Sequence, residues 1–253
     1  MFANERRQII VDLLEEKPSV TVSELMKKFS VSIETVRRDL AYLEKKHALQ
    51  RVHGGAVSAQ KMMTFANLET RMTENIILKQ QLAQTALTFI REHDVLALDT
   101  GSTANELIPL LKENFRHLTM VTNSPDLFHK LCDVPGFELI QIGGQFLRRE
   151  RAFFGHLAVD MIQRLHFSKA IIFPSAVSLK HGIGVFVHEL FDIQRAMMQQ
   201  ADEVLILADS SKFETTATIK LCDHSPSHTL ITNRNLSEEL YNLYIKNDIH
   251  IVY

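Results

Sequence analysis

The first fifty residues alternate short amphipathic segments with turn signals. Apolar positions recur every three to four residues over 5–17, which predicts a helix that ends at the Lys-Pro-Ser sequence following it. Thr21 and Glu24 fit a capping box, in which each side chain binds the other's backbone N–H, and this box opens a short second helix. Ser32 is a favourable N-cap for a third helix over 33–46. The pattern predicts three helices, with a tight turn between the second and the third.

Residues 49–57 follow as two extended stretches around Gly54 and Gly55. A Gly-Gly pair between extended stretches is typical of a two-residue hairpin turn. We therefore expect residues 1–57 to form one small domain of three helices and a β-hairpin. Residues 58–67 are polar and show no periodicity at their start, which is typical of a linker.

The remainder, residues 68–253, alternates strand and helix patterns. A long helical pattern covers 68–90, and short apolar runs then predict buried strands at 95–98, 118–121, 139–142, 170–173, 204–208, 229–231 and 249–252. Helical patterns lie between most of them, at 103–113, 125–132, 156–165, 189–201 and 236–246. This alternation predicts an α/β domain with a mainly parallel sheet covered on both faces.

Composition narrows the class of protein. The 253 residues are 45% hydrophobic and 23% charged, as in an ordinary globular protein, and no apolar run approaches the ~18 residues of a membrane helix. The two cysteines, Cys132 and Cys222, are too few for a disulfide framework. The histidines have no metal-ligand spacing on a predicted helix, and no nucleotide-binding glycine motif is present, so we expect no metal and no cofactor. We expect a cytoplasmic protein without a membrane partner.

Charge and polarity in the N-terminal domain favour a nucleic-acid partner. Residues 27–53 contain seven basic and three acidic side chains, although the whole chain has a net charge of −2. A helix that follows a tight turn, with Thr35 near its start and Arg37 and Arg38 beside its apolar stripe, suits the DNA major groove. Arg51 and His53 on the hairpin are placed to contact the adjacent backbone or minor groove. The alternative is a three-helix domain that binds protein.

Polar residues in the C-terminal domain follow successive predicted strands. Because parallel strands end at the same edge of a sheet, these residues converge on one crevice. Gly101, Ser102 and Thr103 open a helix directly after a strand, an arrangement that presents hydroxyl and N–H donors to a phosphate. We predict that Lys212 supplies the counter-charge and that Asp99 or Asn123 binds hydroxyl groups of the ligand.

Several motifs are similar to those of the DeoR/GlpR family of bacterial transcriptional regulators, and they occur in order along nearly the whole chain. They are the run from Val31 to Leu40, Leu49 to Val57, Glu69-Thr70-Arg71 with Asn75 and Lys79, Leu98 to Thr103, Val121 to Ser124, Ile142-Gly143-Gly144, Gly155, and Ala208 to Phe213. The resemblance implies a winged helix-turn-helix domain joined to a sensor domain that resembles the sugar-phosphate isomerase fold. It also implies repression of a sugar-catabolism or sugar-transport operon, relieved by a phosphorylated sugar or related metabolite.

The two sets of candidate residues follow from these arguments together. The predicted contacts to double-stranded operator DNA are Thr21, Ser23, Ser32, Thr35, Arg37, Arg38, Tyr42, Arg51 and His53. The predicted contacts to the phosphorylated sugar-like effector are Asp99, Gly101, Ser102, Thr103, Thr122, Asn123, Ser124, Gly143, Gly144, Arg148, Ser175, Glu189 and Lys212. No catalytic residue is predicted. One winged domain covers one half-site, so we also expect a homo-oligomer, a dimer or a tetramer, with its contact in 68–253.

The chain departs from the family pattern at several positions. The resemblance leads us to expect a lysine at position 194, where Gln194 stands, and glycines at the positions of Phe173, Ala176 and Glu214. Leu147 replaces an expected basic residue, and Pro174 is also atypical. These departures leave open a larger or less charged effector. The rival function is a sugar-phosphate isomerase that uses Asp99 or Asp209 as base and Lys212 to bind phosphate.

Overall fold

The computed structural model describes residues 3–16, 19–46, 48–52, 54–58 and 66–253. The chain divides into two compact units, Met1–Thr64 and Phe65–Tyr253. Among the described residues, no helix combines the length and the apolar character that crossing a membrane requires.

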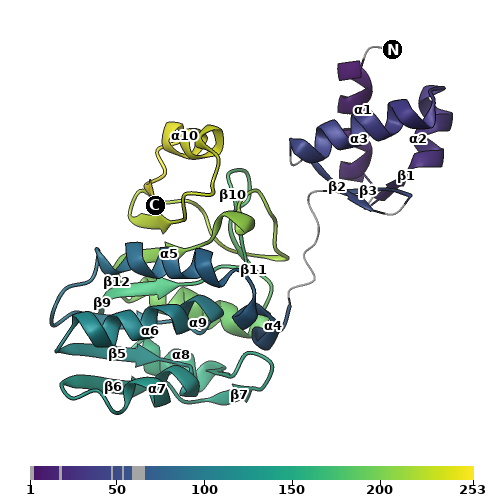
Figure 1. Cartoon of the computed structure of the whole chain (residues 1–253). Coiled ribbons are helices and arrows are strands. Elements are labelled where there is room, and N and C mark those ends of the chain that lie inside the picture. Colours follow the sequence, from purple (N-terminus) through teal and green to yellow (C-terminus); the bar gives the residue numbers. More distant parts are fainter. Residues whose placement is uncertain (1–2, 17–18, 47, 53, 59–65) are drawn as a thin grey trace. The chain divides into compact units, whose positions relative to one another are not determined.

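The N-terminal unit packs three helices on a small antiparallel sheet (Figure 1). Its elements are α1 (Ala3–Glu16), β1 (Ser19–Thr21), α2 (Val22–Phe29), α3 (Ile33–Lys45), β2 (Leu49–Val52) and β3 (Gly55–Ser58). The capping box between Thr21 and Glu24 is present, and Ser32 caps α3 through the Thr35 N–H. Leu25, Val36 and Leu40 lie at the centre of its apolar core, each 1% exposed.

Two details of this unit differ from the sequence-based expectation. Ser19, the last residue of the Lys-Pro-Ser sequence, begins strand β1, which pairs with β3. Gly55 lies in β3, opposite Val52, rather than in the hairpin turn, whereas Gly54 has a φ of +84°. A Cβ atom at Gly55 would lie 2.1 Å from the carbonyl oxygen of Val20, so close strand packing, and not the turn, requires this glycine.

The C-terminal unit is built on a seven-stranded sheet whose strand pairs are all parallel, in the order β15-β14-β12-β9-β4-β5-β6. The strands are β4 (Val95–Leu98), β5 (Leu118–Thr122), β6 (Phe137–Gln141), β9 (Phe167–Ile172), β12 (Ala201–Leu207), β14 (His228–Ile231) and β15 (Ile251–Val252). The predicted mainly parallel α/β sheet is confirmed. The strand order reverses between β4 and β9, because β4 leads to β5 and β6 on one side and β9 leads to β12 on the other.

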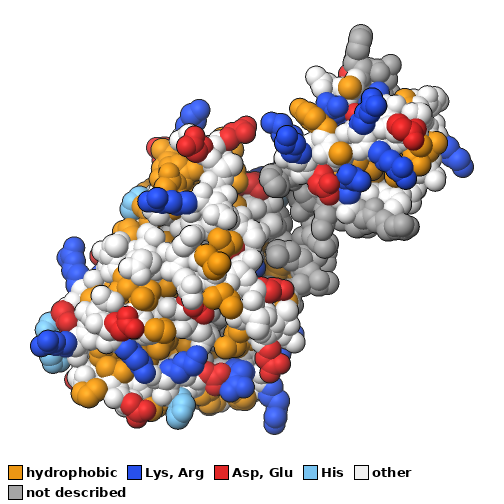
Figure 2. Space-filling view, in the orientation of Figure 1, with side chains coloured by type: hydrophobic (Ala, Val, Ile, Leu, Met, Phe, Trp, Pro, Cys, Tyr) orange, Lys and Arg blue, Asp and Glu red, His pale blue; other side chains and the backbone are white. Residues whose placement is uncertain are grey.

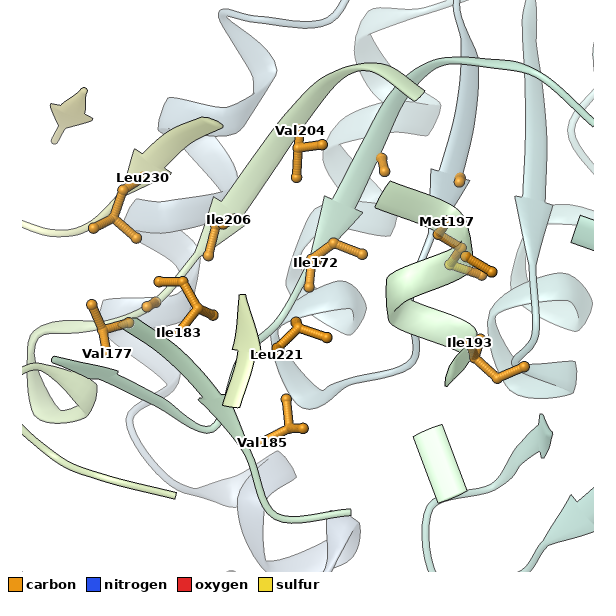
Figure 3. Packing of buried hydrophobic residues seen from close by; sticks show 14 of the residues in the cluster. Ile172, Val177, Ile183, Val185, Ile193, Met197, Val204, Ile206, Leu221 and Leu230 are labelled. Carbon is orange, nitrogen blue, oxygen red and sulfur yellow. The ribbon is translucent and has the colours of Figure 1, made fainter. Parts of the chain in front are cut away.

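Helices cover both faces of this sheet (Figure 1). One face packs against α5 (Ile76–Leu87), α6 (Ser102–Asn114) and α7 (Pro125–Leu131), and the other packs against α8 (His156–Ile162) and α9 (His188–Gln199). Each face of the sheet thus has its own core, the first against α5, α6 and α7 and the second against α8 and α9. Alternate residues of a strand enter opposite cores: Leu96 and Leu98 lie in the first core, whereas Ala97 lies in the second. Figure 3 shows the second core, where Ile172, Val204 and Ile206 of the sheet pack with Ile193 and Met197 of α9.

The predicted helix over 68–90 is two helices. α4 (Leu68–Thr73) ends before Asn75, which has a φ of +52°, and α5 begins at Ile76. Asparagine is among the few non-glycine residues that adopt the left-handed conformation readily, and one such residue is enough to redirect the chain. The apolar periodicity continues across the break, so the sequence pattern did not reveal it.

Several short strands were not predicted. β7 (Gln145–Leu147) and β8 (Ala152–Phe154) form a hairpin, and β10 (Ala176–Ser178), β11 (Gly182–Val185) and β13 (Ile219–Cys222) form a small antiparallel sheet. The latter closes the second core through Val177, Ile183 and Leu221 (Figure 3). The remaining described elements are the 3-10 turn η1 (Ser210–Lys212) and helix α10 (Glu238–Lys246).

Candidate nucleic-acid interface and effector site

The N-terminal end of α3 presents the predicted base-contacting residues. The Ser32 hydroxyl accepts the Thr35 N–H at 3.3 Å, and the two hydroxyl oxygens lie 3.1 Å apart. Arg37 and Arg38 are exposed, while Val36, Leu40 and Leu43 of the same helix are buried. The sequence therefore placed these two guanidinium groups on the correct, solvent-facing side of α3. Figure 2 shows Lys and Arg side chains on the visible surface of this unit.

A buried acidic residue joins α3 to α1. Asp39 is 2% exposed, and its two carboxylate oxygens accept the Nε–H groups of Arg6 at 2.5 Å and Arg7 at 2.9 Å. The Arg7 guanidinium also lies 3.8 Å from the ring centre of Tyr42. Tyr42, a predicted DNA contact, is thus half exposed and stacked on α1. The two ion pairs fix the rotation of α3 about its axis, and with it the face that carries Arg37 and Arg38.

The other predicted DNA contacts occupy the start of α2 and the hairpin. Thr21 uses its hydroxyl in the capping box, and Ser23 is exposed in the first turn of α2. Arg51 is exposed on β2 with a loose ion pair to Glu44 at 3.7 Å. His53 lies outside the described residues.

A cavity opens at the carboxyl edge of the parallel sheet, where the strand order reverses. This is the place where α/β sheets bind ligands. Of the predicted effector contacts, Gly101, Ser102, Thr103 and Lys212 line it. Residues at the ends of β9 and β12 also line the cavity. Its remaining side is formed by α4, α5 and the turn between them. The full lining is Arg71, Glu74, Asn75, Lys79, Gly101, Ser102, Thr103, Phe173, Pro174, Leu207, Ala208, Asp209 and Lys212.

Three cationic side chains meet at this cavity. Lys79 is 5% exposed, and its ammonium group donates to the backbone oxygens of Arg71 and Glu74. Burial lowers the pKa of Lys79, and the positive charge of Lys212 lowers it further. Burial is also the main cause that lowers the pKa of Lys212 and that of Arg71. The protonated side chains thus lose hydration at this cavity, and an anion bound among them would stabilise their charged forms.

The first turn of α6 adds backbone donors to the same cavity. Gly101 occupies the N-cap position and has no side chain to bind the helix N–H groups, so no internal cap satisfies them. A helix N-terminus without a cap attracts anions through these groups and through the helix dipole. Gly101 also packs against Phe173, whose ring atoms would lie 3.2 Å from an added Cβ.

Asp99 lies beneath the cavity rather than in its lining. It is fully buried and accepts three hydrogen bonds, from the Thr100 N–H at 2.8 Å, the Phe173 N–H at 3.4 Å and the Gln194 side-chain amide at 2.7 Å. Burial raises the pKa of Asp99 to about 7, because these bonds do not compensate for lost hydration. Gln194, at the position where the family pattern has lysine, gives Asp99 a hydrogen bond but no counter-charge.

The β7–β8 hairpin packs against the loops that follow β5 and β6. Asn123 is fully buried, and its side-chain amide and backbone oxygen both bind the backbone of Phe153, at 3.1 and 2.8 Å. Ser124 caps α7, and an added Cβ at Gly144 would lie 2.5 Å from the Phe154 carbonyl oxygen. Of the predicted effector residues, the structure thus places Thr122, Asn123, Ser124, Gly143 and Gly144 outside the cavity lining, because the hairpin occupies this part of the sheet edge.

The last predicted effector residues also lie outside the lining. Ser175 is buried and accepts the Phe186 N–H at 3.3 Å. Arg148 is exposed in the turn after β7, and Glu189 pairs with Arg149 at 2.7 Å. Conversely, Arg71, Glu74, Asn75 and Lys79 were not predicted as site residues. A lysine on the inward side of a helix, between apolar positions, was the available sequence signal for Lys79.

The family departures separate into two groups. Phe173 and Pro174 line the cavity and give it an apolar wall. Glu214 faces away from it: its carboxylate accepts the Leu179 N–H at 3.1 Å and the Tyr244 hydroxyl at 2.7 Å. Ala176 is buried in β10, and neither it nor Glu214 belongs to the lining. Among the departures from the family pattern, Phe173 and Pro174 therefore line this cavity, and Ala176 and Glu214 do not.

Comparison with known proteins assigns both units. The model of the DeoR-like helix-turn-helix domain matches residues 6–62, and the model of the DeoR C-terminal sensor domain matches residues 74–234. The L-fucose operon activator of Haemophilus influenzae is 32% identical over 98% of this chain and 99% of its own length. The HTH-type transcriptional repressor GlcR of Bacillus subtilis is 29% identical over 100% of this chain and 96% of its own length.

Among solved structures, ribose 5-phosphate isomerase A of Methanocaldococcus jannaschii has 17% sequence identity and a TM-score of 0.41, covering 55% of each chain. A similarity at this level says nothing about activity. The two matched domain models instead define the class of protein: a transcriptional regulator with an N-terminal DNA-binding domain and a C-terminal sensor domain. The chain belongs to the DeoR family of these regulators.

Proposed function

We propose that this regulator represses a sugar-catabolism or sugar-transport operon and is released from its operator by a phosphorylated sugar-like metabolite. The observation that carries the proposal is the cavity at the sheet edge, where Lys79, Lys212 and Arg71 meet the uncapped N-terminus of α6. Burial lowers the pKa of both lysines, so a dianionic phosphate beside them would stabilise their protonated forms. The names of relatives include both an activator and a repressor, so activation is the alternative sign of regulation.

The size and walls of the cavity favour a ligand with an anionic end and a modest polar body. Ser102 and Thr103 supply hydroxyl groups, and Asp209 and Asn75 supply further polar atoms at the rim. Phe173, Pro174 and Leu207 give the cavity an apolar wall. The family pattern has glycine at the position of Phe173. A ligand with an apolar or deoxygenated side facing this wall would lose less hydration than a fully hydroxylated one.

The helix α3 supports operator binding at the other end of the chain. Its exposed Arg37 and Arg38 and its capped N-terminus match the geometry by which a recognition helix reads a major groove. We further propose that two or more copies assemble through 68–253, so that two winged domains bind two half-sites. A regulator that binds chromosomal DNA works in the bacterial cytoplasm.

The rival isomerase function requires a carboxylate that can reach the substrate. Asp99 is fully buried, lies outside the cavity lining and is bonded to Gln194. Asp209 does line the cavity, but its carboxylate already accepts the Ser211 N–H at 2.9 Å in a turn. These contacts argue for structural carboxylates, and we propose that the protein is not an enzyme. An assay for interconversion of pentose and hexose phosphates tests this directly, and turnover above the uncatalysed rate would contradict it.

The test of the main proposal combines DNA selection with ligand screening. Duplexes enriched from a random pool by the full-length protein should share a repeated half-site, and binding should weaken steeply with salt as phosphate contacts are screened. A thermal-shift panel of phosphorylated and unphosphorylated sugars should then identify the effector class, since a ligand at 100 times its Kd stabilises the folded state by about 2.7 kcal/mol. Stabilisation by unphosphorylated sugars alone would overturn the assignment of the anion site.

A further inference from the structure

Helix α4 is both the first described helix after residues 59–65 and a wall of the cavity. Arg71 projects from α4 into the lining, and Glu74 and Asn75 of the following turn also line it. The helix is only six residues long, too short to be stable without tertiary contacts. Its position therefore depends on what holds it to the rest of the unit.

Two of the cavity's three cations hold α4 in place. The Arg71 guanidinium binds the carboxylate of Glu150 and donates through Nε to the Ala66 carbonyl oxygen at 3.0 Å. The Lys79 ammonium donates to the carbonyl oxygens of Arg71 and Glu74, which lie at the end of α4. The Asn75 amide reaches the Ser211 hydroxyl at 3.4 Å, beside Lys212.

The partner of Arg71 is itself anchored at the sheet edge. Glu150 is 4% exposed and lies in the turn between β7 and β8. Its backbone oxygen accepts the Thr100 hydroxyl at 3.3 Å, and Thr100 precedes Gly101 at the start of α6. The buried carboxylate of Glu150 therefore neutralises a guanidinium that also lines the cavity.

We propose that Arg71 and Lys79 couple the occupancy of the cavity to the position of α4. An anion in the cavity attracts both side chains, and it competes with Glu150 for Arg71 and with the α4 carbonyl groups for Lys79. Ligand binding then draws the α4–α5 turn towards Ser102, Thr103 and Lys212. This inference rests on the proposed function, because it takes the ligand to be an anion at this site.

The coupling follows from linkage. If the anion binds more tightly to the arrangement in which Arg71 leaves Glu150, it shifts α4 towards that arrangement by the ratio of the two affinities. Because α4 directly follows the segment that connects the two units, a shift of α4 is the shortest covalent route from the cavity to the DNA-binding domain.

Hydrogen exchange on the full-length protein tests the coupling, with inorganic phosphate as the probe and sodium chloride as the ionic-strength control. Phosphate binding is first measured by thermal shift. At saturating phosphate, amides of residues 66–79 should exchange at least ~5-fold more slowly, because the anion ties the α4–α5 turn to the sheet edge. The amides of α10 serve as the internal reference and should not change.

The variant Glu150→Gln removes the competing charge. It should bind phosphate about 10-fold more tightly than the wild type and exchange faster at 66–79 when phosphate is absent. Asp126→Asn is the matched control, because it breaks a carboxylate–arginine pair with the neighbouring Arg151, which is exposed and outside the cavity lining. Should Glu150→Gln fail to fold, Arg71→Lys replaces it. Lysine keeps the positive charge but cannot bind the Ala66 carbonyl oxygen and the Glu150 carboxylate through two separate nitrogen atoms. This variant should reduce the phosphate-dependent protection of 66–79.

The outcomes separate the two proposals. Phosphate binding without any change in exchange over 66–79, or equal phosphate affinity in Glu150→Gln and Asp126→Asn, would overturn the coupling and leave the anion site intact. Absence of phosphate binding by the wild type would overturn the anion site, and the coupling with it.

Discussion

The side-chain amide of Gln194 donates to the carboxylate of Asp99 at 2.7 Å, and both residues are buried outside the lining of the candidate effector cavity. They lie 95 positions apart in the chain, one after β4 and the other in the middle of α9. A neutral amide thus serves as the closest side-chain partner of a fully buried acid. This relationship makes the stability of the sensor unit depend on pH.

We expect Asp99 to reduce stability as pH rises. Its pKa is about 7 in the folded protein and about 3.9 in an unfolded chain, so the folded state keeps a proton that the unfolded state loses. The free energy of unfolding therefore falls between about pH 4 and pH 7 and levels off above. Relative to Asp99→Asn, the wild type should lose about 2 kcal/mol between pH 5.5 and pH 7.5, as measured by thermal unfolding at each pH.

The variant Gln194→Lys checks the cause of that pH dependence. An ammonium group beside Asp99 stabilises the carboxylate and lowers its pKa, so the fall in stability over this pH range should disappear. Arg195→Lys, a change at the adjacent position that leaves Gln194 in place, is the control. An unchanged pH profile in Gln194→Lys would mean that Asp99 is not the titrating group.

The Asp39 carboxylate should be essential to the N-terminal unit. Asp39→Asn leaves Arg6 and Arg7 without their buried partner, and breaking a buried ion pair in this way costs about 3–5 kcal/mol. DNA binding should fall with the loss of folded domain. Asp12→Asn, at an exposed position of α1, should leave the thermal unfolding of this unit unchanged. Equal melting temperatures for the two variants would show that the pairs to Asp39 contribute nothing.

The exposed arginines of α3 should carry operator affinity. Arg38→Ala is expected to weaken binding to the selected duplex by ~1–3 kcal/mol if it contacts a guanine, and to weaken all duplexes alike if it contacts a phosphate. Binding is measured by fluorescence anisotropy over a salt series. Arg164→Ala removes the same charge from an exposed site of the sensor unit and is the control. If a triple variant of Thr35, Arg37 and Arg38 to alanine binds as the wild type does, α3 is not the recognition helix.

Lys212 should be required for the response to effector but not for DNA binding. Lys212→Met removes one charge-assisted hydrogen bond to the anion, which should weaken binding of the identified sugar phosphate by ~10–100-fold. The operator complex of this variant should then persist at effector concentrations that release the wild type. Lys220→Met, in an exposed pair with Asp223, should behave as the wild type does. Release at the wild-type concentration would place the anion elsewhere, with Arg148 and Arg149 the next candidates.

Two variants of Glu214 distinguish the effect of backbone strain on stability from the effect of the side-chain hydrogen bonds. Its φ is +49°, a conformation that costs non-glycine residues about 1–2 kcal/mol, while its carboxylate binds the Leu179 N–H and the Tyr244 hydroxyl. Glu214→Ala and Glu214→Gly both lose these bonds, but only glycine relieves the strain. Thermal unfolding should therefore find Glu214→Gly more stable than Glu214→Ala by about 1 kcal/mol. The reverse order would mean that the strain is absent.

The sequence by itself determined the features that depend on neighbouring residues. The capping box at Thr21, the N-cap at Ser32 and the exposure of Arg37 and Arg38 follow from the period of one helix and from bonds spanning three residues. The parallel sheet followed from the alternation of strands and helices. Gly101, Ser102 and Thr103 were found as site residues because a strand, a glycine and a helix start adjoin in the chain.

Tertiary structure decided which distant residues share the cavity. Arg71 and Lys79 stand in a family motif, but their apolar surroundings ran through the bend at Asn75 as one helical pattern, and only the packed fold brings them to Lys212. The polar residues after β5 looked like ligand contacts, but the β7–β8 hairpin takes their hydrogen bonds, as Asn123 does with Phe153. Local patterns specify which groups a residue can bind, whereas the competition between partners that are remote in sequence is settled only when the chain is folded.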